Sequence, residues 1–404
     1  MDVFVARQPI FDRQIKVFAY ELLFRSGPEN YFTGTDYDAS SSKVISDGVS
    51  LLGLDMLIGR KRAFVNFSRA ALVNDFAFVL PRERVVIEVL ETVEPDNDVV
   101  AAVRRLKDAG YQLALDDFES VERFEPLLDM VDYVKVDFLA TTAPEDRATL
   151  SRLLSARGIR MVAEKVETRE DVDEAVRTGY TLFQGFFFAR PVMIPAKEVP
   201  GFRLNYLKLV NEINLPETRP DRLEEIMKQE VSMAYRLLRY INSAAFGFRA
   251  EVTSIKHAIV LLGLQEIRKL ATVWALAGLG RDRPVELVVT STTRARFCEL
   301  IACAAGREES ASRAFLVGMF SLIDAIIGRP ISDLMDSLSI GPDERAALLG
   351  QGGPLKTILD CVIAYERGEW ESCLALAAQI GLDEPTLADQ YLRATDWSRG
   401  IFAA

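Results

Sequence analysis

Histidine is almost absent from this chain of 404 residues, whose only histidine is His257. Zinc hydrolases of the His-rich kind and HD-type phosphohydrolases need several histidine ligands, so neither metal site can be built here. Any catalytic chemistry must therefore use carboxylates, lysine and amides. His257 itself stands beside Lys256 in a helical pattern, where we expect a partly exposed or capping side chain.

Cysteine is also scarce. The four cysteines lie in the C-terminal half, in apolar helical patterns and without paired metal-ligand spacing: Cys298, Cys303, Cys361 and Cys373. We expect a reduced, cytoplasmic protein in which they are small core residues. No apolar run approaches the roughly 18 residues that span a bilayer. The N-terminus is charged within two residues and is interrupted by Pro9, which excludes a signal peptide. Membrane insertion is not expected.

An excess of positive charge is missing as well. The chain has 48 Lys and Arg against 59 Asp and Glu, which gives a formal net charge of −11. A broad nucleic-acid-binding face is therefore not expected. Hydrophobic residues make up 49% and charged residues 26%, the balance of a folded protein. The length suggests about two to three domains.

Up to about residue 195, short apolar strands alternate with amphipathic helices. Three helical stretches end at Gly110, Gly158 and Gly179, and a strand follows each glycine directly, as at a left-handed helix terminus. Roughly eight strands rich in Val, Ile and Leu, with no G-x-G-x-x-G motif, favour a (β/α)₈ TIM-like barrel over an open sheet. Further strands are expected at residues 17–24, 63–67, 85–90 and 132–137.

The pattern changes after Pro195 and Pro200. Residues 200–404 are almost entirely helical in pattern, with short helices separated by Gly and Pro breaks. This spacing is typical of a compact all-α helical bundle. We therefore divide the chain into a barrel domain over residues 1–195 and a helical domain over residues 200–404.

Polar side chains follow the strands of the predicted barrel, at the edge where functional groups of such barrels gather. Strand ends meet solvent, so single polar residues there need no explanation. A ring of acids is different, because neighbouring carboxylates repel one another unless cations balance them. Hard divalent ions, Mg²⁺ or Mn²⁺, suit oxygen ligands, and two ions about 3.5–4 Å apart suit phosphodiester hydrolysis. The ring consists of Glu21, Asn66, Glu91, Asp116, Asp117, Lys135, Asp137, Glu164, Glu167 and Gln184.

Eight short motifs occur in order over about residues 1–195: RQPIF, ELLFR, VNFS, EVLE, ALDDF, VKVD, AEKVE and FQGFFFARP. Together they resemble the EAL family of cyclic-di-GMP phosphodiesterases. The resemblance implies metal-dependent hydrolysis of cyclic di-GMP to the linear dinucleotide. It implies one ion held by Glu21, Asn66, Glu91 and Asp116, and a second held by Asp116, Asp117 and Glu164.

The resemblance also assigns roles to the remaining motif residues. Lys135 would orient the attacking water together with the metal ions, with Glu164 near it, and Glu167 and Gln184 would complete the pocket. Arg25 would contact a phosphate group, a task that suits its guanidinium. The catalytic residues are thus Lys135, Glu164 and Glu167, and the substrate contacts are Gln8, Arg25, Asp137 and Gln184.

Four departures from the family pattern leave a second function open. Leu22 replaces a small alanine and Leu90 a threonine, and the segment after Asp117 lacks the family's glycines. Lys165 replaces a glycine. Strand alternation should point Lys165 away from the face of Glu164, but if the chain turns there, its ammonium group could replace a metal ion. The alternative to an enzyme is a catalytically silent domain that binds cyclic di-GMP or serves as a scaffold.

The helical half resembles the HDOD family of signalling domains over about residues 200–375. The resemblance rests on the segment LLRYINSAAFGFRAEVTSIKHAIVLLGLQEIRKL, within which Asn242 and Ser243 are expected to form structural hydrogen bonds. The aliphatic residues Ala258, Ile259 and Leu262 are expected in the core. The family implies docking rather than catalysis: to the barrel, to a second copy in a homodimer, or to a signalling protein.

Overall fold

The computed structural model describes residues 3–26, 54–118, 120–140, 144–189, 201–215, 217–229, 231–243, 246, 252–280 and 283–403. The chain forms two compact units. The first consists of Met1–Arg190 with Ala364–Leu374 and Asp383–Asp389, and the second contains the rest. The predicted division at residues 195–200 lies outside the described residues and stays a prediction. The two short C-terminal segments that join the barrel unit were not expected from the sequence.

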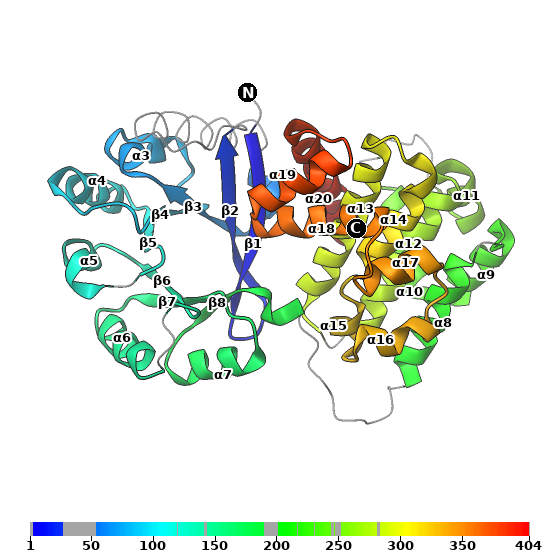
Figure 1. Ribbon diagram of the computed structural model, residues 1–404, viewed down its shortest axis with the longest axis horizontal. Helices are drawn as coiled ribbons and strands as arrows, with labels where there is room; N and C mark the ends of the chain where they lie inside the picture. Colours follow the sequence, from blue (N-terminus) through cyan, green and yellow to red (C-terminus); the bar gives the residue numbers. More distant parts are fainter. Residues whose placement is uncertain are drawn as a thin grey trace. The chain divides into compact units, whose positions relative to one another are not determined.

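The first unit is a closed barrel of eight strands, which confirms the predicted fold class (Figure 1). β1 runs antiparallel to both of its neighbours, β2 and β8, and the remaining pairs are parallel. β1 and β2 can be antiparallel because a short turn joins them, where the Asp12 side chain accepts from the N–H groups of Gln14 and Lys16. The strands are β1 (Val3–Asp12), β2 (Val17–Ser26), β3 (Arg62–Phe67), β4 (Val85–Val89), β5 (Gln112–Leu115), β6 (Tyr133–Asp137), β7 (Arg160–Glu164) and β8 (Leu182–Gln184).

Helices follow the parallel strands and lie on the outside of the barrel (Figure 1). Glycines at the predicted helix ends have positive φ: +88° at Gly110, +75° at Gly158 and +102° at Gly179. These positions explain why glycine is used, since a Cβ atom is strained there. The elements are α2 (Leu54–Ile58), α3 (Arg69–Val73), η1 (Phe76–Val79), α4 (Asn97–Asp108), α5 (Val121–Leu128), α6 (Pro144–Ala156), α7 (Arg169–Arg177) and η2 (Phe186–Ala189).

One buried layer inside the barrel takes a single residue from each strand. These residues are fully or almost fully buried and contact one another as one hydrophobic cluster. Because side chains alternate along a strand, the residue two positions further along each strand faces the same interior. The layer therefore fixes which residues can reach the barrel mouth. Its members are Ile10, Ala19, Phe64, Val86, Ala114, Tyr133, Val162 and Leu182.

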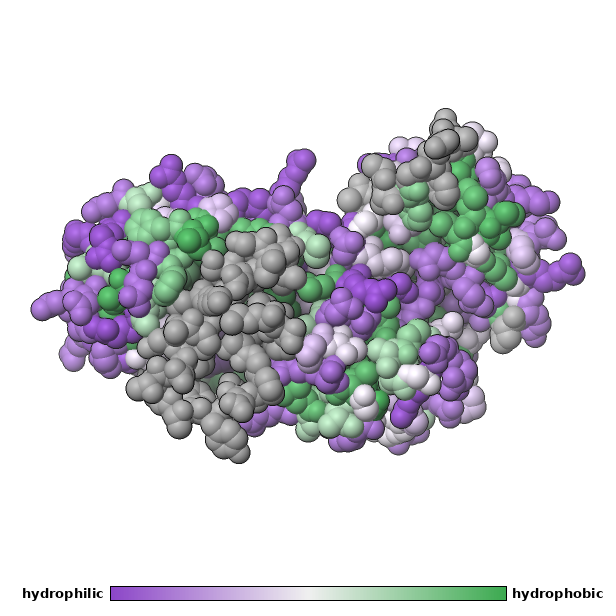
Figure 2. Space-filling view, turned by 90° about the horizontal axis from the view of Figure 1, so that it is seen from above, coloured by the Kyte–Doolittle hydropathy of each residue, from purple (hydrophilic) through white to green (hydrophobic). Residues whose placement is uncertain are grey.

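The second unit is helical, as predicted. Figure 2 shows hydrophilic residues over much of its surface and a hydrophobic area on one face. The helices from Gly201 to the C-terminal end are α8 (Gly201–Asn214), α9 (Pro220–Gln229), α10 (Val231–Ile241), α11 (Ile255–Leu262), α12 (Leu264–Leu279), α13 (Val285–Ala304), η3 (Glu308–Ser310), α14 (Ala311–Phe320), α15 (Ile323–Ile327), α16 (Ile331–Leu334), η4 (Met335–Ser337), α17 (Pro342–Leu348), α18 (Pro354–Arg367), α19 (Trp370–Gln379) and α20 (Glu384–Ala403).

Polar residues of the second unit have structural roles. The Asn242 side chain donates to the carbonyl of Val252 and accepts from its N–H, both at 2.8 Å, so it closes the connection before α11. Ser254 caps α11 by accepting from the N–H of His257, whose side chain is exposed. Cys303 is exposed, so the expectation that every cysteine is a core residue is wrong at this position. No helix in the described part of the chain is long and apolar enough to cross a membrane.

Candidate functional site

The barrel mouth is lined by the interior layer above the hydrophobic one. Each of the strands β2 to β8 contributes one residue to the hydrophobic cluster inside the barrel. The residue two positions further along the same strand is polar in every case. On β1, which runs the other way, Gln8 lies two positions before Ile10 and pairs with Glu21. Strand alternation alone therefore brings these side chains to one level. They are Glu21, Asn66, Glu88, Asp116, Lys135, Glu164 and Gln184.

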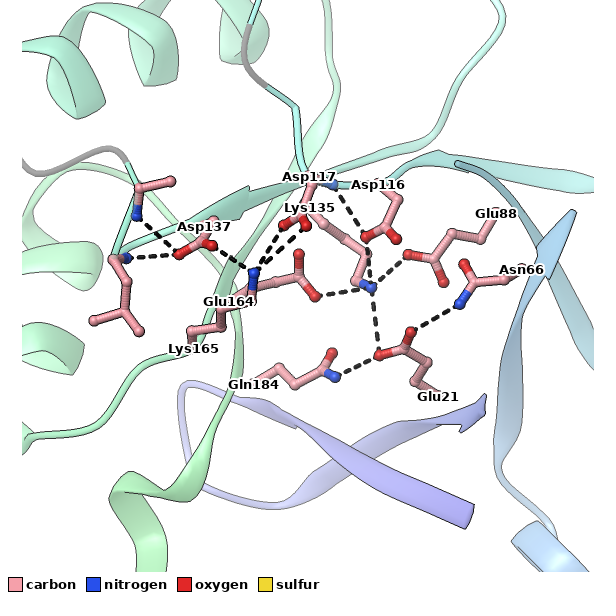
Figure 3. A network of polar contacts seen from close by, with 12 residues as sticks. Glu21, Asn66, Glu88, Asp116, Asp117, Lys135, Asp137, Glu164, Lys165 and Gln184 are labelled. Atoms are coloured by element: carbon pink, nitrogen blue, oxygen red, sulfur yellow. Dashed lines mark hydrogen bonds and ion pairs between the residues drawn. The ribbon is translucent and has the colours of Figure 1, made fainter. Parts of the chain in front are cut away.

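Lys135 is the centre of this layer (Figure 3). Its side chain is only 1% exposed, and its Nζ lies 2.5 Å from Glu88 Oε1 and 2.8 Å from Glu164 Oε1. The same nitrogen lies 3.0 Å from Asp116 Oδ1 and 3.4 Å from Glu21 Oε2. One ammonium group thus faces four carboxyl groups, which it cannot neutralise when all of them are ionised. The remaining negative charge must be relieved by protonation of some of these acids or by a further cation.

Glu21 is held in place by two amide side chains. Asn66 Nδ2 donates to Glu21 Oε1 at 3.1 Å, and Gln184 Nε2 donates to Glu21 Oε2 at 2.5 Å. Gln184 Nε2 also reaches Gln8 Oε1 at 3.2 Å, and Gln8 Nε2 donates to the carbonyl of Arg367 at 3.1 Å. Asn66, Gln184 and Gln8 therefore orient the Glu21 carboxylate toward the centre of the layer.

Two consecutive acids reach the pocket at the end of β5, where alternation would permit only one. β5 ends at Leu115, and Asp117 has a left-handed φ of +36°, so the chain turns directly after Asp116. The Asp117 N–H donates to Asp116 Oδ1 at 3.0 Å, and the Phe118 N–H donates to the Lys135 carbonyl at 2.9 Å. The turn thereby places Asp116 against Lys135 and Asp117 beside it.

Lys165 joins the rim of the pocket because the chain turns after β7. Its φ is +53°, and its Nζ lies 2.5 Å from Asp137 Oδ2 and 3.4 Å from Asp117 Oδ2 (Figure 3). The expectation that strand alternation directs Lys165 away from the site is therefore wrong. The strand ends at Glu164, so alternation no longer applies to the next residue.

Burial and charge shift the protonation of the pocket. Burial raises the pKa of Glu88 and of Glu164 well above the usual value, against the opposing effect of Lys135. Burial also acts to lower the pKa of Lys135, but the carboxylates around it outweigh this and hold its pKa well above the usual value. The pKa of Asp116 is lowered, because Lys135 outweighs the effect of burial. Without a further cation, Glu88 and Glu164 thus retain protons to higher pH than ordinary carboxyl groups.

The structure corrects one member of the predicted ring. Glu88, which is completely buried, stands in the layer, whereas Glu91 follows the end of β4 at Val89 and lies outside both acidic groups. The segment VVIEVLE offers two acids three residues apart, and only one of them has the parity of the inward-facing Val86. Because every residue of β4 is buried, counting by two from Val85 leads to Glu91 and counting from Val86 leads to Glu88, and only the structure shows that Val86 faces inward.

Other predicted site residues lie at or beyond the rim. Glu167 is exposed, and its N–H donates to Asp171 Oδ2 at 3.2 Å, so its catalytic role stays a prediction. Asp137 is held by Lys165 and accepts from the N–H groups of Leu139 and Ala140 at 2.6 and 3.1 Å. Arg25 belongs to β2, but its side chain lies outside the described residues.

The structure places two of the departures from the family pattern. Leu22 is completely buried and, by its parity on β2, faces the opposite side from Glu21. The glycine-free segment after Asp117 leads into the short helix α5, which Ser120 caps by accepting from the N–H of Arg123 at 3.3 Å.

The residues of the layer fit a divalent cation. Several buried oxygens of the layer accept no hydrogen bond from the described residues, among them Asn66 Oδ1, Glu88 Oε2, Glu164 Oε2 and Gln184 Oε1. Such atoms are costly to bury unless a ligand satisfies them. Two acidic groups have ligand atoms within 4.8 Å of one another, namely Glu21 with Glu88 and Asp116, and Asp116 with Asp117 and Glu164. Carboxylate and amide oxygens are the donors that Mg²⁺ and Mn²⁺ prefer.

Stabilisation of the protein by Mn²⁺ is expected to increase with pH. The pKa values of Glu88 and Glu164 are raised in the folded protein, so without metal these two acids stabilise the fold while they are protonated. This contribution to stability is present at low pH and is lost as the pH rises through the raised pKa values. A cation must displace those protons, so its affinity should fall about tenfold per pH unit for each proton displaced. Differential scanning fluorimetry from pH 5.5 to 8.5 measures this as a growing rise in Tm. A rise in Tm that is independent of pH would contradict it.

The fold and the polar layer define a closed barrel with an acidic mouth, followed by a helical unit. A sequence model of the EAL domain matches residues 61–191, and one of the HDOD domain matches residues 199–329. The chain is 34% identical over 412 residues to the uncharacterized protein YuxH of Bacillus subtilis, and each chain is covered completely. It therefore belongs to the family of proteins that join an EAL domain to an HDOD domain.

A second relative carries a functional name. The chain is 33% identical over 402 residues to the cyclic di-GMP phosphodiesterase CdgJ of Vibrio cholerae, with 98% of this chain and 93% of that protein covered. Among solved structures, the complex of Klebsiella pneumoniae BlrP1 with calcium and cyclic di-GMP is 24% identical, with a TM-score of 0.40. That match covers 47% of this chain and 56% of the other.

Proposed function

We propose that the barrel is a divalent-metal-dependent phosphodiesterase that opens cyclic di-GMP to the linear dinucleotide. The observation that carries the proposal is the arrangement of four carboxyl groups around Lys135. Several buried oxygens of this layer accept no hydrogen bond and could bind a cation. The relative CdgJ, which is named as a cyclic di-GMP phosphodiesterase, matches almost the whole chain and supports the substrate.

The layer supplies both the ligands and the polar groups that hydrolysis requires. Glu21, Asn66, Glu88 and Asp116 would hold Mg²⁺ or Mn²⁺. When bound, the cation would polarise the phosphodiester and lower the pKa of a water molecule. Lys135 Nζ and Glu164 Oε1, 2.8 Å apart, place a donor beside an acceptor that can orient water and accept its proton. One water molecule is consumed: its oxygen bonds to phosphorus, the 3′ oxygen leaves, and that oxygen is protonated.

The polar groups of the rim are proposed to contact the dinucleotide. Gln8, Arg25 and Asp137 lie on strands whose ends surround the layer, and an arginine suits a phosphate group. Gln184 acts mainly on Glu21 in the structure, so we propose it as a positioning residue.

The proposal is tested by incubating the purified full chain with cyclic di-GMP and Mn²⁺ or Mg²⁺, followed by nucleotide chromatography. We expect the linear dinucleotide to form and expect a chelator to stop its formation. A second candidate function is a silent cyclic-di-GMP-binding scaffold, which is favoured by the ammonium group of Lys165 between Asp117 and Asp137. Binding of the dinucleotide without any product would establish that alternative and refute the enzyme.

The two acids of the β4 segment form a matched pair of variants. Glu88→Gln removes a proposed ligand from the completely buried layer, and we expect turnover to fall by about 10²- to 10³-fold. Glu91→Gln makes the same chemical change outside both acidic groups, and turnover should stay within about twofold of the wild type. Steady-state kinetics at saturating Mn²⁺ measures both. Equal losses in the two variants, or a loss in Glu91→Gln alone, would refute the assignment of Glu88.

We further propose that the HDOD domain binds signalling proteins or a second copy of the chain. Both acidic groups lie in the barrel unit, so the described residues of the helical unit offer no comparable site. Several large apolar side chains of the helical unit are exposed, including Tyr235 at 64%, Val260 at 75% and Val285 at 70%. Figure 2 shows a hydrophobic area on one face of the helical unit, and a contiguous area of this kind suits protein contacts.

A further inference from the structure

The two acidic groups of the pocket differ in their surroundings. The group of Glu21, Glu88 and Asp116 is deep, and the nearest ammonium group to it is that of Lys135. The group of Asp116, Asp117 and Glu164 lies further out and shares Asp116 with the first. Among the described residues, only this outer group has a second lysine beside it: Lys165 Nζ approaches Asp117 Oδ2 at 3.4 Å and Oδ1 at 3.5 Å. Lys135 contacts members of both groups, so the positive charge that distinguishes the outer group is that of Lys165.

The backbone fixes the position of this lysine. Immediately after Lys165, the Val166 N–H donates to the Gln184 carbonyl at 3.0 Å, and the Val166 carbonyl accepts from the Phe187 N–H at 3.2 Å. Gly185 permits this close approach, since a Cβ there would lie 2.1 Å from the Val166 carbonyl oxygen. A left-handed conformation is unfavourable for lysine, and here the contacts of the next residue maintain it.

Lys165 pairs with two acids of the rim through a side chain that is 48% exposed. Its ammonium group lies between Asp137, at 2.5 Å, and Asp117. Asp137 in turn is anchored by the N–H groups of Leu139 and Ala140. A divalent ion bound by Asp117 would stand within a few ångströms of this positive charge, and the two would repel each other in a partly buried site. Binding of such an ion would require Lys165 to leave both acids.

We propose that the ammonium group of Lys165 takes the place of a second divalent ion, so that the pocket holds a single one. The ion belongs to the deep group with Asn66, and Lys165 supplies the positive charge at Asp117. This inference rests on the proposed metal-dependent function and specifies its metal content. Lys165 is a residue that determines how many ions the site accepts.

The test counts Mn²⁺ bound to the full chain by equilibrium dialysis and by electron paramagnetic resonance. Lys165→Met removes the charge and keeps a Cβ at the strained position, while Lys165→Arg keeps the charge. Lys165→Gly removes the charge and suits the positive φ. We expect one ion in the wild type and in Lys165→Arg. We expect a second ion in Lys165→Met and Lys165→Gly, with an affinity at least about tenfold higher than any second binding to the wild type, and a spectrum broadened by the coupling of two neighbouring ions.

Two outcomes would overturn the inference in different ways. Two ions in the wild type, unchanged in Lys165→Met, would refute the role of Lys165 and leave the proposed phosphodiesterase intact. No ion in any of the variants would refute the inference together with the proposed metal-dependent function. A single ion in all variants would also refute it, because Lys165 would then not be what excludes the second ion.

Discussion

Replacing Lys135 by methionine is expected to destabilise the metal-free protein by about 3–5 kcal/mol at pH 8, because it leaves several buried acids without their cation. The lysine is 1% exposed and contacts four carboxyl groups, of which Glu88 is completely buried. Added Mn²⁺ should recover much of this loss, since a bound cation replaces the missing charge. Turnover should fall by about 10²- to 10⁴-fold, because the oriented donor is gone.

Chemical denaturation with and without Mn²⁺ measures the change in the free energy of unfolding. A suitable control is Lys228→Met, which removes a lysine that is 62% exposed and pairs with Glu224 within α9. We expect that control to change stability by less than about 1 kcal/mol. If the two variants lose similar stability, Lys135 does not compensate buried charge.

Replacing Glu21 by alanine is expected to lower turnover by about 10³-fold or more. Glu21 is 5% exposed and accepts from both Asn66 and Gln184. Its loss removes a ligand and one hydrogen bond from each of these two amides. The affinity for Mn²⁺ should fall in parallel. A role in folding alone would instead lower the stability and leave the turnover of the folded fraction unchanged.

The Glu21 experiment has an internal comparison in Gln184→Ala. Gln184 donates to Glu21 at 2.5 Å, and we propose that it acts through that carboxylate. Its loss should therefore reduce turnover less than the loss of Glu21 and should be partly offset by higher Mn²⁺ concentration. Circular dichroism establishes that each variant is folded before the rates are compared. A larger loss of turnover in Gln184→Ala than in Glu21→Ala would contradict the assignment of Glu21 as the ligand and Gln184 as the residue that positions it.

Much of the barrel could be predicted because its signals are local. A glycine after an amphipathic stretch marks the end of a helix, and the left-handed φ values of Gly110, Gly158 and Gly179 agree with that interpretation. β1 was not among the strands that the pattern located, since it contains Pro9 and its neighbours in the sheet are antiparallel. Pairing of this kind depends on the closure of the whole barrel.

The site was predictable as far as strand alternation holds. Asn66, Asp116, Lys135 and Glu164 stand where a period of two from a buried residue places them. Glu88 was missed because apolar residues stand on both sides of it, so the sequence does not show where the strand ends. Glu91, the acid that follows the last apolar residue, was chosen instead. Lys165 depends on a left-handed turn that long-range contacts maintain, and a lysine gives no sign of such a turn.

The most direct test of the pocket is anomalous diffraction at the manganese edge from crystals of the full chain grown with Mn²⁺ and cyclic di-GMP. We expect an anomalous peak among Glu21, Asn66, Glu88 and Asp116, with a phosphate group of the dinucleotide beside it and Lys135 close to both. Anomalous peaks only at other places in the chain, with Lys135 still among its four acids, would contradict the account.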